Sequence, residues 1–298
     1  MSRRRAGDVK VWAALLPLSK MTGRESEMVT YSTTLGDFLR ARRDTCQPED
    51  VGLARERGRR VSGLRRDEVA RLAGMSSEYY MRLEQGRVDS PSRQVLDAIA
   101  RALKLSIVST DYLYRLAGMG APRVSASAPY PREALDMMLR RWRFTPAYIM
   151  DCNFDIVAAN DLMVAISQGD IRAGVNAVQL TFSDDRRRMM EDWDRTARET
   201  VAAFRYRTDE KSARHHEVLL SVAEDPDFAR LWKLHEVNVP VNYEVRASVE
   251  GLGELCVDIQ NLTLPDFHGH TVTLYTAEAG SFTDNVIRDL ALSLGVAA

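Results

Sequence analysis

The sequence has few of the residues that mark a secreted, membrane-spanning or metal-binding protein. Its 298 residues include three cysteines, Cys46, Cys152 and Cys256, which lie far apart and in no metal-ligand spacing. Such sparse cysteines are typical of a reducing compartment and argue against a disulfide framework. No apolar run approaches the roughly 20 residues that a membrane span needs. We therefore expect a cytoplasmic protein with no membrane contact.

Catalytic motifs are also missing. The chain contains no GxSxG, no HExxH and no glycine-rich phosphate loop, and its HH and HGH pairs fit no metal-ligand spacing. The histidines are His215, His216, His235, His268 and His270. We predict no metal, no cofactor and no enzymatic activity. Two alternatives stay open, namely an acyl hydrolase with Cys152 as its nucleophile and a haem sensor that uses a histidine.

Charge is distributed unevenly along a chain whose formal net charge is −1. Residues 1–120 hold 22 basic and 15 acidic side chains, a net charge of +7, whereas the remainder holds 19 and 27, a net charge of −8. A basic part followed by an acidic part indicates that the first meets a polyanion and the second does not.

The stretch from Leu64 to Gly86 predicts two short helices joined by a tight turn. Apolar residues recur at helical spacing before Gly74, which can end a helix by adopting a positive φ. Ser76 is placed to cap a second helix near residues 77–84, in which Tyr80 faces the core. This pattern is typical of a helix-turn-helix whose second helix lies in the major groove of DNA.

The exposed face of this recognition helix carries groups that can read base edges. Arg82 can pair with a guanine and Glu78 can accept from a cytosine amine, although Glu78 also fits stabilisation of the helix dipole. Tyr79 suits either a phosphate or a thymine methyl. The predicted DNA contacts are Arg59, Arg60, Arg65, Arg66, Ser76, Ser77, Glu78, Tyr79, Arg82, Arg87 and Arg93. The flanking arginines are expected to contact phosphates, which fixes the register. Arg59 and Arg60, in the arginine-rich loop 46–63, could instead enter a minor groove, and this loop also fits plain solvated surface.

Other stretches define the domains. Further helices of the first domain are expected over residues 35–45, 91–103 and 109–118. Residues 1–30 are expected to be either a disordered arm or an extension ahead of a true start at Met21 or Met28. They are followed by a helix-turn-helix domain over 31–118, a Gly-, Ser- and Pro-rich linker over 119–131 and a second domain over 132–298.

The second domain combines strands with helices. A helix over 132–142 precedes a hairpin formed by PAYIM and DIVAA. Helices are then expected over 184–207, 212–223 and 227–235, followed by the β-rich segments VNYEVRASV, GELCVDIQNLTL and HTVTLYTAE. Two strands, then helices, then three strands predict an α+β domain with an antiparallel sheet covered by helices.

These motifs resemble a known family when taken together. RRDEVARLAGMSSEYYMRLEQGR and SPSRQVLDAIARALKL are similar to the XRE (lambda-repressor-like) helix-turn-helix. LGDFLRARR, PAYIMDCNFDIVAAND, DPDFARLWKLHEV and GELCVDIQNLTLPDFHGHTVTLYTAEAGS resemble a bacterial subgroup with an MmyB-like ligand-binding domain. The resemblance spans about residues 35–282. It implies an all-α lambda-repressor-like domain followed by an α+β PAS-like domain, whose relatives are associated with fatty-acyl ligands.

Apolar and aromatic side chains of the second domain are candidates for either plain core or a ligand cavity. Flexible methionine suits such a cavity because it adapts to ligand shape, and Arg198, Arg205 or His235 are the obvious partners for an acidic head group. The predicted ligand-binding residues are Ile149, Asn160, Met163, Phe182, Met190, Trp193, Arg198, Leu219, Trp232 and His235.

The sequence therefore predicts a bacterial transcriptional regulator. It would bind double-stranded operator DNA as a homodimer and sense a small hydrophobic ligand such as a fatty acid. The remaining alternative from another class is a non-specific DNA-binding protein, which would show steep salt dependence and no sequence preference.

Overall fold

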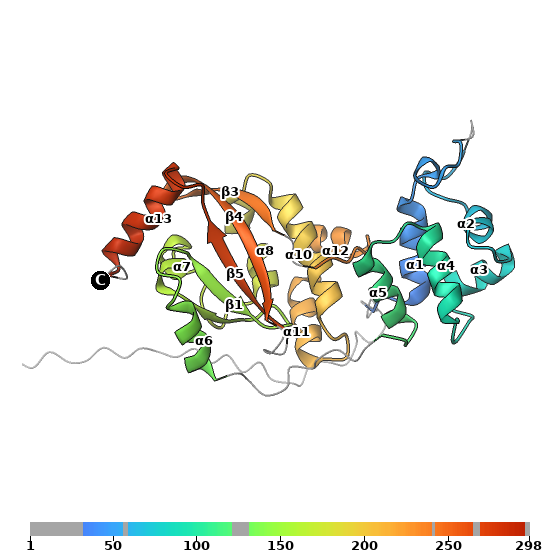
Figure 1. Cartoon of the computed structure of the whole chain (residues 1–298), viewed down its shortest axis with the longest axis horizontal. Coiled ribbons are helices and arrows are strands. Elements are labelled where there is room, and N and C mark those ends of the chain that lie inside the picture. The colour runs from blue at the N-terminus through green and yellow to red at the C-terminus, as the bar shows by residue number, and fades with distance from the viewer. Residues whose placement is uncertain (1–31, 56–58, 121–130, 240–241, 265–268, 296–298) are drawn as a thin grey trace, which may run out of the picture. The chain divides into compact units, whose positions relative to one another are not determined.

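The structure is a computed structural model that describes residues 32–55, 59–120, 131–239, 242–264 and 269–295. The predicted N-terminal extension and most of the predicted linker lie outside these residues. Figure 1 shows a helical N-terminal domain and a C-terminal domain built on a sheet. The predicted combination of an all-α domain with an α+β domain is confirmed.

The helical domain buries one small apolar core. Its elements are α1 (Leu35–Thr45), the 3-10 helix η1 (Pro48–Val51), α2 (Arg66–Leu72), α3 (Ser77–Glu84), α4 (Arg93–Ala102) and α5 (Ile107–Leu116). Side-chain oxygens cap four of them, and the Ser76 hydroxyl accepts from the Tyr79 amide at 3.1 Å, as predicted. Phe38, Leu64 and Tyr80 are fully buried in the core.

Two glycines shape this domain. Gly74 adopts φ +67° between α2 and α3, which confirms the predicted helix end. Gly36 lies where α1 crosses the end of α3, and a Cβ there would come within 2.3 Å of the Glu84 carbonyl oxygen. The two helices can therefore approach this closely only because residue 36 has no side chain.

The C-terminal domain contains a five-stranded antiparallel sheet with strand order β2-β1-β5-β4-β3. The strands are β1 (Ala147–Met150), β2 (Ile156–Ala159), β3 (Tyr243–Val249), β4 (Gly253–Leu264) and β5 (His270–Thr276). The helices are α6 (Arg132–Leu139), α7 (Asp161–Ile166), α8 (Ala177–Thr181), α9 (Asp184–Met189), α10 (Trp193–Arg207), α11 (Ala213–Val222), α12 (Pro226–Trp232) and α13 (Phe282–Ser293).

The two faces of the sheet are buried against different helices. Leu135 and Leu139 of α6 pack on one face against Ile149 and Leu274. Residues of the opposite face, including Tyr148 and Tyr275, pack in a second cluster with α7, α9 and α13. This alternation follows from the two-residue side-chain period of a strand.

Several features differ from the sequence prediction, which did not include the short helices α7 and α8. The helix expected over 184–207 is interrupted, because Met190 forms an antiparallel bridge to Ala247 and the Glu191 amide donates to the Arg246 carbonyl at 3.0 Å. These bonds tie the break to the outer side of the edge strand β3. The C-terminal helix α13 was missed although Ser281 caps it, accepting from the Asp284 amide at 3.1 Å.

Candidate DNA-recognition helix and ligand pocket

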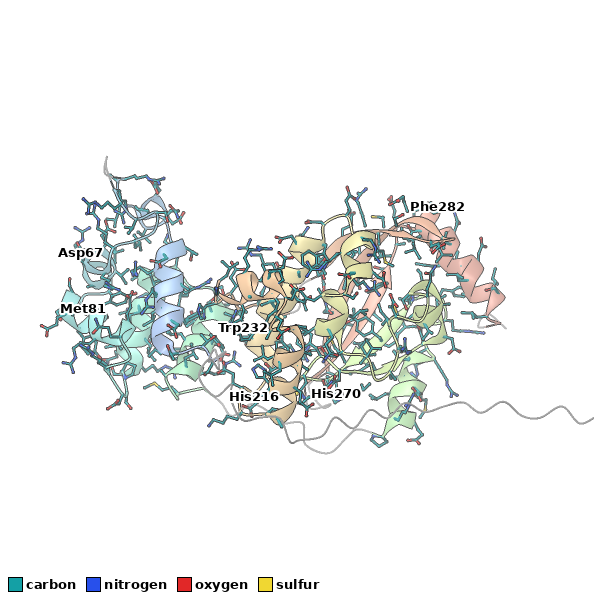
Figure 2. The ribbon with its side chains drawn as sticks, turned by 180° about the vertical axis from the view of Figure 1, so that it is seen from behind. Asp67, Met81, His216, Trp232, His270 and Phe282 are labelled. Atoms are coloured by element: carbon teal, nitrogen blue, oxygen red, sulfur yellow. The ribbon has the colours of Figure 1, made fainter. Side chains whose placement is uncertain are left out.

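Helix α3 presents one polar face to solvent and buries the other. Ser77, Glu78 and Arg82 are exposed, whereas Tyr80 and Leu83 lie in the core. Figure 2 shows Asp67 on α2 and Met81 on α3 at the outer surface of the helical domain. The exposed face offers hydroxyl, carboxylate and guanidinium groups to a base edge, and their DNA contacts stay predictions.

A buried carboxylate holds the recognition helix in place. The side chain of Glu84, at the end of α3, is fully buried and accepts from Arg43 Nε of α1 at 2.6 Å and from Arg66 Nε of α2 at 2.7 Å. Arg43 also donates to the Leu64 carbonyl at 2.9 Å. One carboxylate thus joins the three helices of the motif and fixes the angle at which α3 is displayed.

The predicted phosphate contact by Arg59 is wrong for this structure. Its side chain is 2% exposed, and its Nη1 donates to Glu68 Oε1 at 2.7 Å. Glu68 also accepts from the Arg65 amide at 2.6 Å, so it caps the start of α2. The sequence shows that the loop is basic. It does not show that Glu68, nine residues after Arg59, binds the side chain of that arginine.

This bond makes the helical domain sensitive to acid. The hydrogen bond from Arg59 lowers the pKa of Glu68 from 4.5 to about 2. Because the folded-state pKa is depressed, the stabilisation is complete above about pH 4.5 and is lost as the pH falls toward 2. We expect the free energy of unfolding to fall by on the order of 1–3 kcal/mol across this range. In urea titrations at several pH values, the free energy of unfolding of Glu68→Gln should fall less between pH 4.5 and pH 2 than that of wild type. An equal fall in both proteins would show that Glu68 does not cause the sensitivity to acid.

The other predicted phosphate contacts remain accessible. Arg60, Arg66, Arg87 and Arg93 are exposed and Arg65 is half-buried. The Arg93 guanidinium lies 5.0 Å from the ring centre of Tyr114, which limits its side-chain freedom. These positions surround α2 and α3, so the basic surface of the domain lies around the recognition helix.

Most of the predicted ligand residues belong to buried packing rather than to one shared cavity. Phe182, Trp193 and Trp232 join Phe228 in an aromatic cluster with ring-centre distances of 5.3–5.7 Å. Met163 and Leu219 are buried core residues. Ile149 is buried on the sheet face that α6 covers, apart from the aromatic cluster, and its role as a ligand residue stays a prediction.

Asn160 serves the fold. It caps α7, accepting from the Met163 amide at 2.9 Å, and also accepts from the Ala147 amide at 3.1 Å. Its amide nitrogen donates to the carbonyls of Thr145 and Trp142 at 2.9 and 3.2 Å. With oxygen and nitrogen both engaged, Asn160 has a structural role in the domain, and its ligand role stays a prediction.

The three predicted partners for an acidic head group are engaged elsewhere. Arg198 donates to Glu236 at 2.6 Å. Arg205 is buried and donates to the backbone carbonyls of Trp232 and Glu236. His235 Nδ1 lies 3.3 Å from the Thr33 hydroxyl, and burial together with the charge of Arg205 lowers the pKa of His235 to about 4. The imidazole is therefore neutral near pH 7 and attracts no carboxylate.

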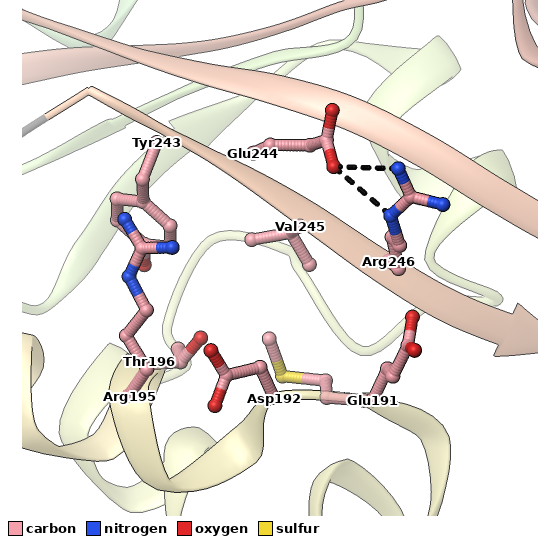
Figure 3. Close-up of a pocket in the computed structure, with 9 residues that line it drawn as sticks. Glu191, Asp192, Arg195, Thr196, Tyr243, Glu244, Val245 and Arg246 are labelled. Atoms are coloured by element: carbon pink, nitrogen blue, oxygen red, sulfur yellow. Dashed lines mark hydrogen bonds and ion pairs between the residues drawn. The ribbon is translucent and has the colours of Figure 1, made fainter.

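Three pockets of similar size open on the surface. They have volumes of about 420, 360 and 370 Å³ and include, in turn, the predicted ligand residues Met190, Asn160 and Arg198. The first lies between β3 and the start of α10, where the Arg195 guanidinium stands beside the ring of Tyr243 at 5.7 Å (Figure 3). Thr196 and Tyr243 belong to its wall, and Glu244 and Arg246 form an ion pair beside it.

The sequence analysis did not single out a set of tyrosines on one face of the sheet, of which Tyr243 lines this pocket. Tyr148, Tyr243 and Tyr275 come from three strands. The tyrosines share one sheet face, since Tyr243 and Tyr275 both pair with Ile259 and Tyr148 pairs with Thr273. Alternation within each strand could have placed them on a common face once the pairing was known.

The histidines lie in different surroundings. His215 stacks on Phe204 with ring centres 5.1 Å apart, whereas His216 is exposed (Figure 2). Across the described parts of the chain no group of three metal-binding side chains comes together, and no helix there is long and apolar enough to span a bilayer.

Comparison with known families gives two matches. Residues 34–113 match a family described as a helix-turn-helix domain. Residues 131–290 match a family described as the MmyB-like transcription regulator ligand binding domain. No curated protein matches the chain. The two matched regions coincide with the helical domain and with the domain that contains the sheet.

Proposed function

The chain belongs to the family of transcription regulators with an MmyB-like ligand-binding domain, and from this premise we propose that it binds a specific operator as a homodimer in the cytoplasm and responds to a fatty-acyl-like ligand. It performs no catalytic step in this proposal. The ligand acts by binding more tightly to one of two conformations that differ in affinity for DNA. Neither the acyl hydrolase nor the haem sensor has a specific observation in its favour among the described residues.

The proposal that the chain binds DNA is supported mainly by the exposed polar face of α3. Its exposed side chains Ser77, Glu78 and Arg82 stand on a helix whose opposite side is fixed by the buried bonds of Glu84. A recognition element must be held rigidly because base discrimination depends on bidentate geometry. The net charge of +7 over residues 1–120 adds the attraction to phosphates.

The ligand part is supported by the family match and by the pocket between β3 and α10. Its volume of about 420 Å³ falls within the size range of small-molecule sites. Met190 lies in its lining, and a methionine side chain can adapt its shape to an apolar chain.

We expect Arg82→Ala to weaken operator binding by about 5- to 150-fold, which corresponds to about 1–3 kcal/mol, and to relax preference at one base position. The measurement is an electrophoretic titration on duplexes that the wild-type protein has selected from a random pool. Arg87→Ala is the matched comparison, since loss of a phosphate contact should weaken all duplexes equally and reduce the salt slope by about one unit.

Two results would contradict the proposal. Wild-type protein that binds every duplex with equal affinity would favour the non-specific DNA-binding protein. An Arg82→Ala variant that binds with unchanged affinity and unchanged preference would remove Arg82 from the base-reading residues.

A further inference from the structure

Met81 is an apolar side chain in the middle of the exposed face of helix α3. It is half-buried, and Figure 2 shows it at the outer surface of the helical domain. Successive residues of an α-helix are rotated by about 100°, so Met81 lies about 40° from Ser77 and about 60° from Glu78 around the helix axis. Ser77, Glu78 and Arg82 are all exposed. Met81 therefore stands between Ser77 on one side and Glu78 and Arg82 on the other.

The other large apolar side chains of α3 belong to the core. Tyr80 and Leu83 are buried in the core cluster of the helical domain, and Tyr79 packs against that cluster. Within the part of the domain that the structure describes, Met81 belongs neither to the cluster nor to the partly buried residues around it. Packing of the core therefore does not account for an apolar side chain at position 81.

Exposure alone would not assign a role to Met81. Single exposed apolar side chains are common on protein surfaces, and this domain has others, such as Ile107 at the start of α5 and Met119 beyond its end. Those two lie outside the helix-turn-helix. Met81 differs from them because it shares one helix face with the side chains proposed to read bases.

The thioether of Met81 restricts what this side chain can contact in a major groove. It has no hydrogen-bond donor, and its sulfur is a weak acceptor. It can therefore bind neither a phosphate oxygen nor an acceptor on a base edge. The apolar group that base pairs present in the major groove is the C5 methyl group of thymine. A flexible, polarisable methionine side chain can adapt its shape to that methyl group.

We infer that Met81 is a specificity-determining residue that recognises a thymine through its C5 methyl group. This inference rests on the proposed sequence-specific DNA binding and deepens it, because it adds an apolar contact to a face that was predicted from its polar groups alone. Residues three and four apart are neighbours on a helix surface. The thymine is therefore expected next to the base pairs that Ser77 and Glu78 contact.

Substitution of single thymines by uracil tests this contact. Deoxyuridine lacks the C5 methyl group and keeps every hydrogen-bonding group of thymine. The probes are duplexes that the wild-type full chain has selected from a random pool, with one thymine replaced at a time. We expect uracil at one position of each half-site to weaken wild-type binding by about three- to fivefold, the effect of one apolar group of this size.

Variants of Met81 connect this loss to the side chain. Met81→Ala should bind the thymine duplex and the uracil duplex with equal affinity, whereas Met81→Leu, with an apolar side chain of similar volume, should keep most of the preference. Met119→Ala is the matched control, since Met119 is 44% exposed outside the helix-turn-helix, and should discriminate like wild type.

The ratio of the two affinities separates a base contact from a structural role. A folding defect, or an effect of uracil on duplex shape, changes the thymine-to-uracil ratio of no variant relative to wild type, because it acts on both duplexes or on both proteins alike. Met81→Ala should also melt at the wild-type temperature, because its side chain is not part of the core cluster.

The failures can be told apart. Wild-type protein that shows no preference among duplexes would contradict the proposed sequence-specific function. If wild type is specific but uracil at every thymine leaves its affinity unchanged, the inference about Met81 is overturned while specific binding remains. A Met81→Ala variant that loses as much affinity with uracil as wild type does also overturns it.

Discussion

Replacement of Glu84 by alanine is expected to lower the free energy of unfolding of the helical domain by about 3–5 kcal/mol. The side chain is fully buried and accepts from Arg43 Nε and Arg66 Nε. Removing it leaves the Nε of Arg43, whose side chain is 8% exposed, without its carboxylate partner, so that this guanidinium keeps only its ion pair with the exposed Asp44 at 2.6 Å and its bond to the Leu64 carbonyl. Breaking a buried pair by removing one partner costs far more than the net contribution of the intact pair.

Hydrogen exchange can measure this loss in the full chain. We expect amides of α1, α2 and α3 to exchange faster in Glu84→Ala, while amides of α10 in the other domain keep their protection. Glu78→Ala, on the exposed side of the same helix, is the control and should exchange like wild type. Protection of α3 that is unchanged in Glu84→Ala would show that the carboxylate does not hold the helix.

The consequence for DNA binding follows from the geometry. Glu84 is buried and cannot contact DNA itself. Its loss should nevertheless weaken operator binding, because α3 then samples orientations in which Ser77 and Arg82 do not reach the base edges. Glu84→Gln should be milder, since the amide keeps one acceptor of nearly the same shape.

Asn160→Ala is expected to destabilise the ligand-binding domain by about 2–4 kcal/mol. The variant loses the cap of α7 and leaves the Ala147 amide and two carbonyls without their present partner. A lost cap costs about 1 kcal/mol, and each buried polar group left unsatisfied adds about 1–3 kcal/mol, reduced where water can enter.

Urea unfolding followed by tryptophan fluorescence reports on this domain, since Trp142, Trp193 and Trp232 all belong to it. The control is Asp161→Ala, which changes the next residue at an exposed position. Asn160→Ala should unfold at a clearly lower urea concentration than wild type, whereas Asp161→Ala should unfold at nearly the wild-type concentration. If Asn160→Ala kept its midpoint and lost only ligand affinity, Asn160 would be a ligand residue and not a structural one.

The helix-turn-helix could be predicted from sequence because its signals are local. Gly74 with its positive φ, Ser76 at the cap and the apolar spacing of α3 act within a few residues of one another. The family motifs extend over both domains in the correct order. The strand order within the sheet was not predicted in detail, but the two strands, the helices and the final three strands were.

The missed features depend on contacts between distant residues. Nothing in the local sequence shows that the backbone at Met190 will leave the helix to pair with Ala247. Similarly, the basic character of Arg59 suggests DNA until Glu68 is seen beside it. Hydropathy predicts that Ile149 is buried but not which sheet face it occupies.

The charged residues predicted to bind the ligand show the same limit, because their partners are distant in sequence. Arg198 and His235 were chosen as chemically suitable, yet each lies beside a residue distant in sequence.

The bridge between Met190 and Ala247 also affects the tendency of the protein to aggregate. The outer edge of a terminal strand offers unpaired backbone groups on which strands of other molecules can assemble into fibrils. Here the chain itself occupies that edge at Arg246 and Ala247, because the Glu191 amide and the backbone of Met190 pair with them. A foreign strand therefore finds the ladder along β3 interrupted at these two residues, which disfavours self-association through this edge.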